Sequence, residues 1–103
     1  MKNVVHIVGT GTIGEPLTGL FTEFHHYLGI DEVTFHKRTP MKSERAKVNR
    51  LMARDAHLAA DQDKIADFEA LGHRISCGTR EALERATVVI DCTPAGNETK
   101  ELL

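Results

Sequence analysis

The most constraining feature of this sequence is a glycine-rich turn that joins an apolar run to a segment with helical periodicity. Residues 3–8 are mostly apolar and rich in β-branched side chains, which is typical of a strand buried on both faces of a parallel sheet. The pattern Gly9-x-Gly11-x-x-Gly14 follows at once, and apolar side chains then recur at helical spacing as far as Leu28. A strand, a glycine turn and a helix in this order predict a unit that binds a dinucleotide.

Each glycine of this turn has a physical role if the turn binds a dinucleotide. Gly9 allows a sharp turn off the strand, Gly11 lets a pyrophosphate approach the backbone, and Gly14 lets the helix pack close to the strand. The amides of the next two residues would point from the helix N-terminus toward the anion. We therefore predict that five residues of the turn bind the cofactor: Gly9, Gly11, Thr12, Ile13 and Gly14. The alternative is a glycine-rich turn without a ligand.

The segments that follow alternate between strand-like and helix-like patterns. We expect the first helix over residues 12–28, with an inward stripe formed by Ile13, Leu17, Leu20, Phe21, Phe24 and Leu28. Strands are expected over 33–36, 74–77 and 87–92, the last of them buried. Helices are expected within 42–54, over 61–71, and over 80–85 with Thr79 as the cap. Residues 55–60 fit either a short strand or a turn.

Two of these helices also have expected inward-facing residues. In the helix within 42–54 they are Ala46, Leu51 and Ala53. In the helix over 61–71 they are Ile65, Phe68 and Leu71, followed by Gly72 as the stop.

The alternation of strands and helices predicts the fold class. It favours an α/β fold with right-handed crossovers, that is, a Rossmann-like doubly wound parallel sheet, incomplete, with about four strands. A complete dinucleotide domain has about six strands and needs a longer chain. We therefore interpret residues 1–103 as a partial dinucleotide-binding domain cut near Leu103, and we expect the catalytic domain to be absent from this chain.

The residues after the second expected strand bear on the choice of cofactor. An acidic residue at this point would bind the ribose 2′-hydroxyl of NAD, but this chain has Lys37 and Arg38 there. Residues 37–54 carry seven basic side chains against Glu44 alone. We predict that Lys37 and Arg38 bind a 2′-phosphate, so that the cofactor is NADP with NAD also accepted. The basic residues from Arg45 to Arg54 are expected to be a solvated helix face.

Three segments together point to a known family. They are the run from Val8 to Gly14, the lysine-containing turn with Pro40, and Val89-Ile90-Asp91-Cys92-Thr93-Pro94-x-Gly96. With the helix-like stretch 65–72, they resemble the archaeal-type (type II) glyceraldehyde-3-phosphate dehydrogenases. The resemblance implies that Thr12 and Ile13 contact the pyrophosphate, and it makes Thr93 a predicted cofactor-binding residue.

The resemblance also implies an activity for the full-length protein. This would be the phosphorylating oxidation of a small phosphorylated aldehyde, a step of glycolysis, with hydride transfer to NAD(P) in a homo-oligomer. The catalytic cysteine would lie downstream, so no residue of this chain is assigned chemistry and the chain alone is expected to be inactive. Two alternatives stay open. One is another Rossmann reductase, such as an aspartate-semialdehyde or homoserine dehydrogenase, and the other is a dinucleotide-sensing module without catalysis.

Other kinds of site are disfavoured by the sequence. His25 and His26 are neighbours on a helix and point about 100° apart, so we expect no metal site. The basic stretch lacks aromatic platforms, so we expect no nucleic-acid partner. No run of apolar residues is long enough to span a membrane. Cys77 and Cys92 are expected to be core thiols. Two cysteines form no disulfide framework and the N-terminus does not resemble a signal peptide, so we expect a cytoplasmic protein.

Overall fold

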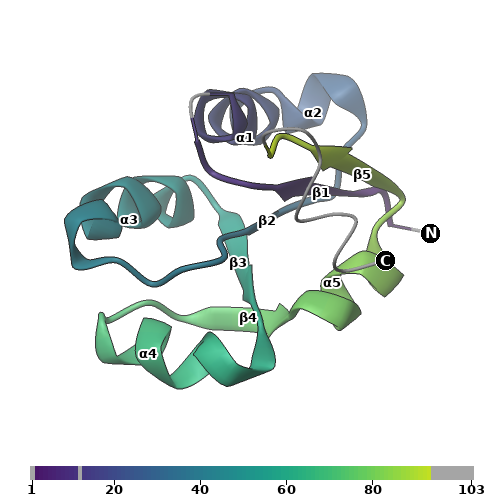
Figure 1. The fold of residues 1–103 in the computed structure, drawn as a ribbon. Coiled ribbons are helices and arrows are strands. Elements are labelled where there is room, and N and C mark those ends of the chain that lie inside the picture. The colour runs from purple at the N-terminus through teal and green to yellow at the C-terminus, as the bar shows by residue number, and fades with distance from the viewer. Residues whose placement is uncertain (1, 12, 94–103) are drawn as a thin grey trace.

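The strands form one parallel sheet in the order β4-β3-β2-β1-β5, as the computed structural model shows for residues 2–11 and 13–93 (Figure 1). Their bounds are β1 Val4–Val8, β2 Glu32–His36, β3 Ala56–Ala60, β4 Ile75–Gly78 and β5 Val88–Asp91. The expected Rossmann-like α/β fold is confirmed. The sheet has five strands rather than about four, because residues 56–60, which fitted a strand or a turn, form β3.

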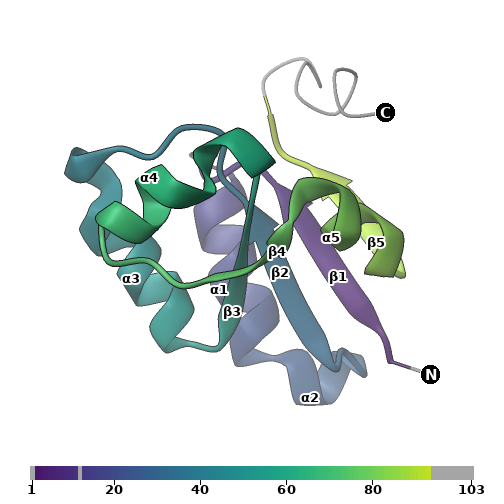
Figure 2. The same ribbon diagram turned by 90° about the horizontal axis from the view of Figure 1, so that it is seen from below.

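Helices cover both faces of this sheet. The bounds are α1 Gly14–Glu23, α2 His25–Leu28, α3 Arg45–Ala53, α4 Ile65–Ala70 and α5 Thr79–Arg85, with short 3₁₀ turns at Lys42–Glu44 and Gln62–Lys64. Helices α1, α3 and α4 lie on one face, and α5 lies on the other (Figures 1 and 2). The main core lies between the sheet and helices α1, α3 and α4, where Phe35 and Leu58 of the sheet meet Phe68 of α4.

The first helix differs from its prediction in length and in orientation. The chain breaks at Phe24, where ψ is 16°, and α2 starts at the next residue. Of the expected inward stripe, only Phe21 packs on the main core, and four members are exposed: Ile13, Leu20, Phe24 and Leu28. The buried positions of α1 are instead Gly14, Thr18, Gly19 and Thr22. Small side chains face inward because the helix lies very close to the turn that precedes it.

The other helices match their predictions in part. In α3, Leu51 is buried as expected, but Ala46 and Ala53 are exposed and Val48 takes the second core position. Phe68 of α4 is fully buried, whereas Ile65 and Leu71 are half-buried.

Thr79 is not the cap of α5. Gly78 occupies the cap position, and the Thr79 hydroxyl donates to Asp61 at 2.5 Å instead. The hydroxyl therefore joins the ends of β3 and β4 rather than closing the helix.

The last strand is less buried than its sequence predicts. Val88 and Val89 are 49% and 40% exposed, although they lie in an almost continuous apolar run. Among the described residues β5 pairs with β1 alone and forms an edge of the sheet, so an apolar run suited to an inner strand lies exposed.

The face under α5 is unusually polar. His6 of β1 and Thr34 of β2 are buried side by side and hydrogen-bonded at 2.6 Å. His36 at the end of β2 is buried as well, and its Nε2 lies 3.2 Å from the Asp61 carboxylate. This face therefore carries a row of buried polar groups that leads to the carboxyl ends of the strands.

Candidate functional site

The strand order reverses next to β1, and this fixes the place of the candidate site. The chain passes from β1 toward β2 on one side, and it returns through α5 to β5 on the other side. In open α/β sheets, ligands bind in the crevice beyond the carboxyl ends of the strands at such a reversal. The glycine turn follows β1 at this point.

Two of the glycines are required by the packing of the chain itself. Gly9 has φ of +99° and its amide donates to the His36 carbonyl at 3.1 Å, so it turns the chain off β1 in a conformation that favours glycine. A Cβ on Gly14 would lie 2.0 Å from the Gly9 carbonyl oxygen. The helix can approach the turn this closely only with glycine at position 14.

Gly11 differs from the other two because the described chain gives no packing reason for it. It is exposed, a Cβ built on it would meet no described atom within 4 Å, and positive φ is found at Gly9, Gly29 and Gly72 but not there. Among the described residues, the missing side chain therefore leaves space beside the backbone of the turn. A ligand that needs close access to the backbone would explain this glycine.

Helix α1 starts three residues after Gly11, so its N-terminus belongs to the same turn. Ile13 occupies the cap position, is 65% exposed, and gives the helix no capping hydrogen bond from its side chain. The Glu15 amide is used within the chain, since it donates to the Gly11 carbonyl at 3.2 Å. Thr12, the remaining predicted residue of the turn, lies outside the described residues.

The tip of β2 differs from the expected pair of phosphate-binding cations. Lys37 is buried, and its amine is bound by the Glu44 carboxylate. This hydrogen bond from Lys37 lowers the pKa of Glu44. Arg38 follows with an exposed side chain. Lys37 is thus at the predicted place, but a carboxylate that sequence reasoning did not assign to the site lies with it.

A second lysine reaches the turn from α3. The Lys47 amine donates to the Thr10 carbonyl at 3.1 Å, and it lies 3.5 Å from the Glu15 carboxylate. The expectation that the basic residues from Arg45 to Arg54 form a solvated helix face is therefore wrong for Lys47. The topology could have revealed it, because the helix after β2 must start at the carboxyl edge and its first turn lies beside the glycine turn.

The loop after β5 closes the other side of the site. The Cys92 amide donates to the Val8 carbonyl at 2.9 Å, which extends the pairing of β1 and β5. The Thr93 amide and hydroxyl both donate to Asp91, at 2.9 and 2.5 Å. A Cβ on Gly9 would be 3.2 Å from the Thr93 methyl group, so the structure brings predicted residue Thr93 against the glycine turn.

The two cysteines are free thiols whose surroundings disfavour the thiolate. Burial raises the pKa of Cys77, which packs with Ala59 and Ala82 under α5. Burial also raises the pKa of Cys92, which packs on the main core. A nucleophilic cysteine needs a lowered pKa, so neither environment is suited to that chemistry.

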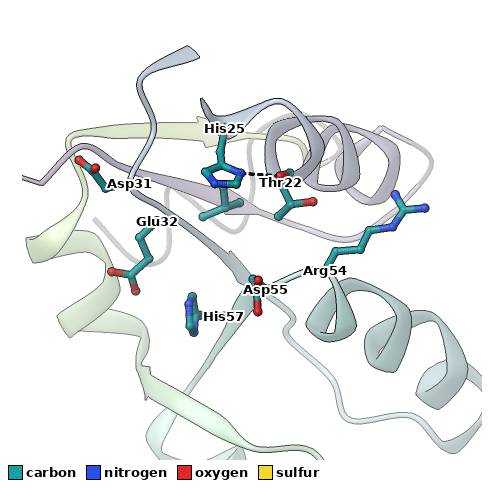
Figure 3. A pocket seen from close by; sticks show the side chains of 8 residues that line it. Thr22, His25, Asp31, Glu32, Arg54, Asp55 and His57 are labelled. Carbon is teal, nitrogen blue, oxygen red and sulfur yellow. Dashed lines mark hydrogen bonds between the residues drawn. The ribbon is translucent and has the colours of Figure 1, made fainter. Parts of the chain in front are cut away.

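A separate cavity of about 260 Å³ lies at the other end of the strands, beside the start of β2 and β3 (Figure 3). Three of its polar side chains are engaged with the chain: His25 with the Thr22 carbonyl, Glu32 with Arg85, and His57 with Ser76. Across the described ranges, no three His, Cys, Asp or Glu side chains are grouped so that they could hold a metal ion. This cavity is far from the strand reversal and is not part of the candidate site.

Comparison with known proteins adds no assignment. No family model matches the chain, and no curated protein matches it. In the part of the chain that the structure describes, no helix has both the length and the apolar character needed to cross a membrane.

Proposed function

We propose that this chain binds a nicotinamide dinucleotide at the turn Gly9–Gly14, as the cofactor-binding part of a phosphorylating glyceraldehyde-3-phosphate dehydrogenase. The observation that carries the proposal is Gly11, a glycine whose Cβ position meets no described atom within 4 Å and for which the described residues give no packing reason. It lies at the strand reversal, beside the N-terminus of a ten-residue helix. A pyrophosphate fits both features, since it needs close access to the backbone and a source of amide hydrogen-bond donors.

The chain's own residues have distinct tasks in this proposal. Gly9 and Gly14 set the shape of the turn, and the amides of Thr12 and Ile13 bind the pyrophosphate. The partial positive charge at the start of α1 stabilises the anion. Thr93, which is held by Asp91, borders the turn on the side of β5. Lys37 and Arg38 at the tip of β2 would lie at the adenosine ribose and favour NADP, with NAD also accepted.

The dehydrogenase part of the proposal rests on the resemblance of the three quoted segments. The cofactor, when bound, supplies the hydride acceptor. This chain's share of the reaction is to bind and orient the cofactor, and the nucleophilic cysteine and the aldehyde site would belong to a further domain. Consistent with this division, burial raises the pKa of both thiols in this chain.

Direct titration tests the proposal. Isothermal titration of the 103-residue chain with NADP and with NAD should show one-to-one binding of both, with NADP somewhat tighter. ADP-ribose, which keeps the pyrophosphate and lacks the nicotinamide, should bind as well because the proposed contacts are made to the diphosphate half. Absence of binding by all three ligands would refute the proposed function.

A further inference from the structure

A carboxylate lies where the sequence predicts only cations. Glu44 follows β2 by several residues, yet its Oε2 accepts a hydrogen bond from Lys37, which comes directly after that strand. The same oxygen lies 3.8 Å from the Lys47 amine. One carboxylate therefore lies between a lysine at the strand tip and a lysine that contacts the glycine turn.

The local structure holds Glu44 firmly in this place. It ends the 3₁₀ turn Lys42–Glu44, and its backbone amide donates to the Met41 carbonyl at 3.0 Å. Helix α3 starts at the next residue, so the carboxylate is at the carboxyl edge of the sheet beside the candidate site. The Glu44 side chain is 29% exposed, whereas Lys37 is buried. The accessible group of this pair is thus the acid.

The pair has different consequences for the two cofactors, if the proposed function is correct. A ribose 2′-hydroxyl can donate to a carboxylate and leave the Lys37–Glu44 pair intact. A 2′-phosphate carries a charge of about −2 and would also bind Lys37. The Glu44 carboxylate already neutralises this lysine, and its negative charge repels the phosphate. We propose that Glu44 limits the preference for NADP over NAD, by competing with the 2′-phosphate for Lys37.

A mild substitution at Glu44 can test this inference without disturbing Lys47, the residue that contacts the glycine turn. Its contacts to the Thr10 carbonyl and to Glu15 do not involve Glu44. Replacing Glu44 by glutamine keeps the size of the side chain and a hydrogen-bond acceptor for Lys37 while it removes the charge. The glycine turn should therefore keep its shape in Glu44→Gln.

The experiment compares dissociation constants for NADP and NAD at fixed ionic strength in three chains. In Glu44→Gln we expect the ratio to shift toward NADP by roughly tenfold, almost entirely through tighter NADP binding. Glu23→Gln is the matched control, because it makes the same charge change on an exposed residue at the far end of α1, and its ratio should equal that of the wild type. Circular dichroism would check that each variant is folded, and Glu44→Ala should shift the ratio in the same direction if Glu44→Gln is unstable.

A second arm links the effect to Lys37. In a Lys37→Met background, Glu44→Gln should shift the ratio toward NADP by much less than it does in the wild-type background, because only the direct repulsion between the carboxylate and the phosphate remains to be relieved. An unchanged ratio in Glu44→Gln, with both cofactors still bound, would overturn this inference and leave the proposed function standing. Failure of the wild-type chain to bind either cofactor would overturn both.

Discussion

The buried histidine of the first strand gives a sharp prediction about stability and pH. His6 is fully buried, and its Nε2 has no hydrogen-bond partner within the described part of the chain. Burial lowers its pKa from 6.5 to about 4, with a further contribution from the nearby charge of His36. The folded protein therefore resists protonation of this ring far more strongly than the unfolded chain does.

The magnitude follows from the linkage of proton binding to folding. Between pH 6.5 and 4 the unfolded chain binds a proton at this histidine that the folded chain does not, so stability falls as the pH falls through this range. Each pKa unit corresponds to about 1.4 kcal/mol, so the loss attributable to His6 at pH 4 is about 3 kcal/mol. Burial also lowers the pKa of His73, which adds a smaller loss of the same sign.

Urea unfolding followed by circular dichroism at pH 7.5 and at several lower pH values measures this effect. The variant His6→Leu replaces the titratable ring by an apolar side chain of similar size. In this variant the decline in unfolding free energy between pH 6.5 and 4 should shrink by about 3 kcal/mol relative to wild type. Thr34→Val is the matched control, because it removes the hydrogen-bond partner of His6 but keeps the buried ring, and its decline should remain as steep as in wild type. If His6→Leu declines as steeply as the wild type, His6 does not titrate as a buried group and the reasoning is refuted.

Three further predictions concern the glycine turn, the strand tip and catalysis. Gly14→Ala should lower the unfolding free energy by about 3 kcal/mol or more, since its Cβ would lie 2.0 Å from a carbonyl oxygen, whereas Gly78→Ala, whose nearest contact is 3.9 Å, should change it far less; thermal melts of the two variants check this. Replacing Lys37 and Arg38 together by alanine should weaken NADP binding and leave NAD binding almost unchanged; an unmoved ratio of dissociation constants would mean that these cations do not contact the 2′-phosphate. The 103-residue chain should show no aldehyde oxidation in a spectrophotometric NAD(P)H assay, and turnover that disappears in Cys92→Ala would contradict this.

The parallel direction of the strands could be predicted because apolar runs alternate with helical patterns along the chain, and glycines mark where the elements end. The strand that could not be assigned, β3, consists of Ala56-His57-Leu58-Ala59-Ala60 and has no β-branched residue. Its conformation is determined by pairing with β2 and β4 on its two sides, which a local pattern does not reveal.

The burial of α1 could not be predicted, for a related reason. Its apolar side chains suggested an inward stripe, but the close approach of the helix to the glycine turn selects small residues for the inner side. Gly14 packs closely, as its place in the turn predicts, and Thr18 and Gly19 lie on the same side of the helix. Extending the close-packing argument to these two small residues would therefore identify the buried face of α1. Periodicity alone gives no information on how near a helix lies to its sheet.

Local patterns point to the glycine turn as one contiguous segment, but they do not show which distant side chains folding brings beside it. The structure places the Thr93 methyl group beside Gly9, so these two predicted cofactor-binding residues lie together. The Lys37–Glu44 pair and the contact of Lys47 with the turn were not expected, because they link residues of the strand tip, the 3₁₀ turn and α3. Charge counts identified the basic stretch, but they could not show which cation already has an acidic partner.

Titration of Gly11→Val with NADP is the most direct test of a dinucleotide site at the glycine turn. The variant should fold as the wild type does, because the described chain leaves open space at this Cβ position, yet it should bind the cofactor at least about a hundredfold more weakly, since the new side chain would fill the place of the pyrophosphate. Ala70→Val adds the same side-chain type at an exposed position at the end of α4 and should bind NADP like the wild type. Wild-type affinity in a folded Gly11→Val would show that the glycine turn is not the dinucleotide site.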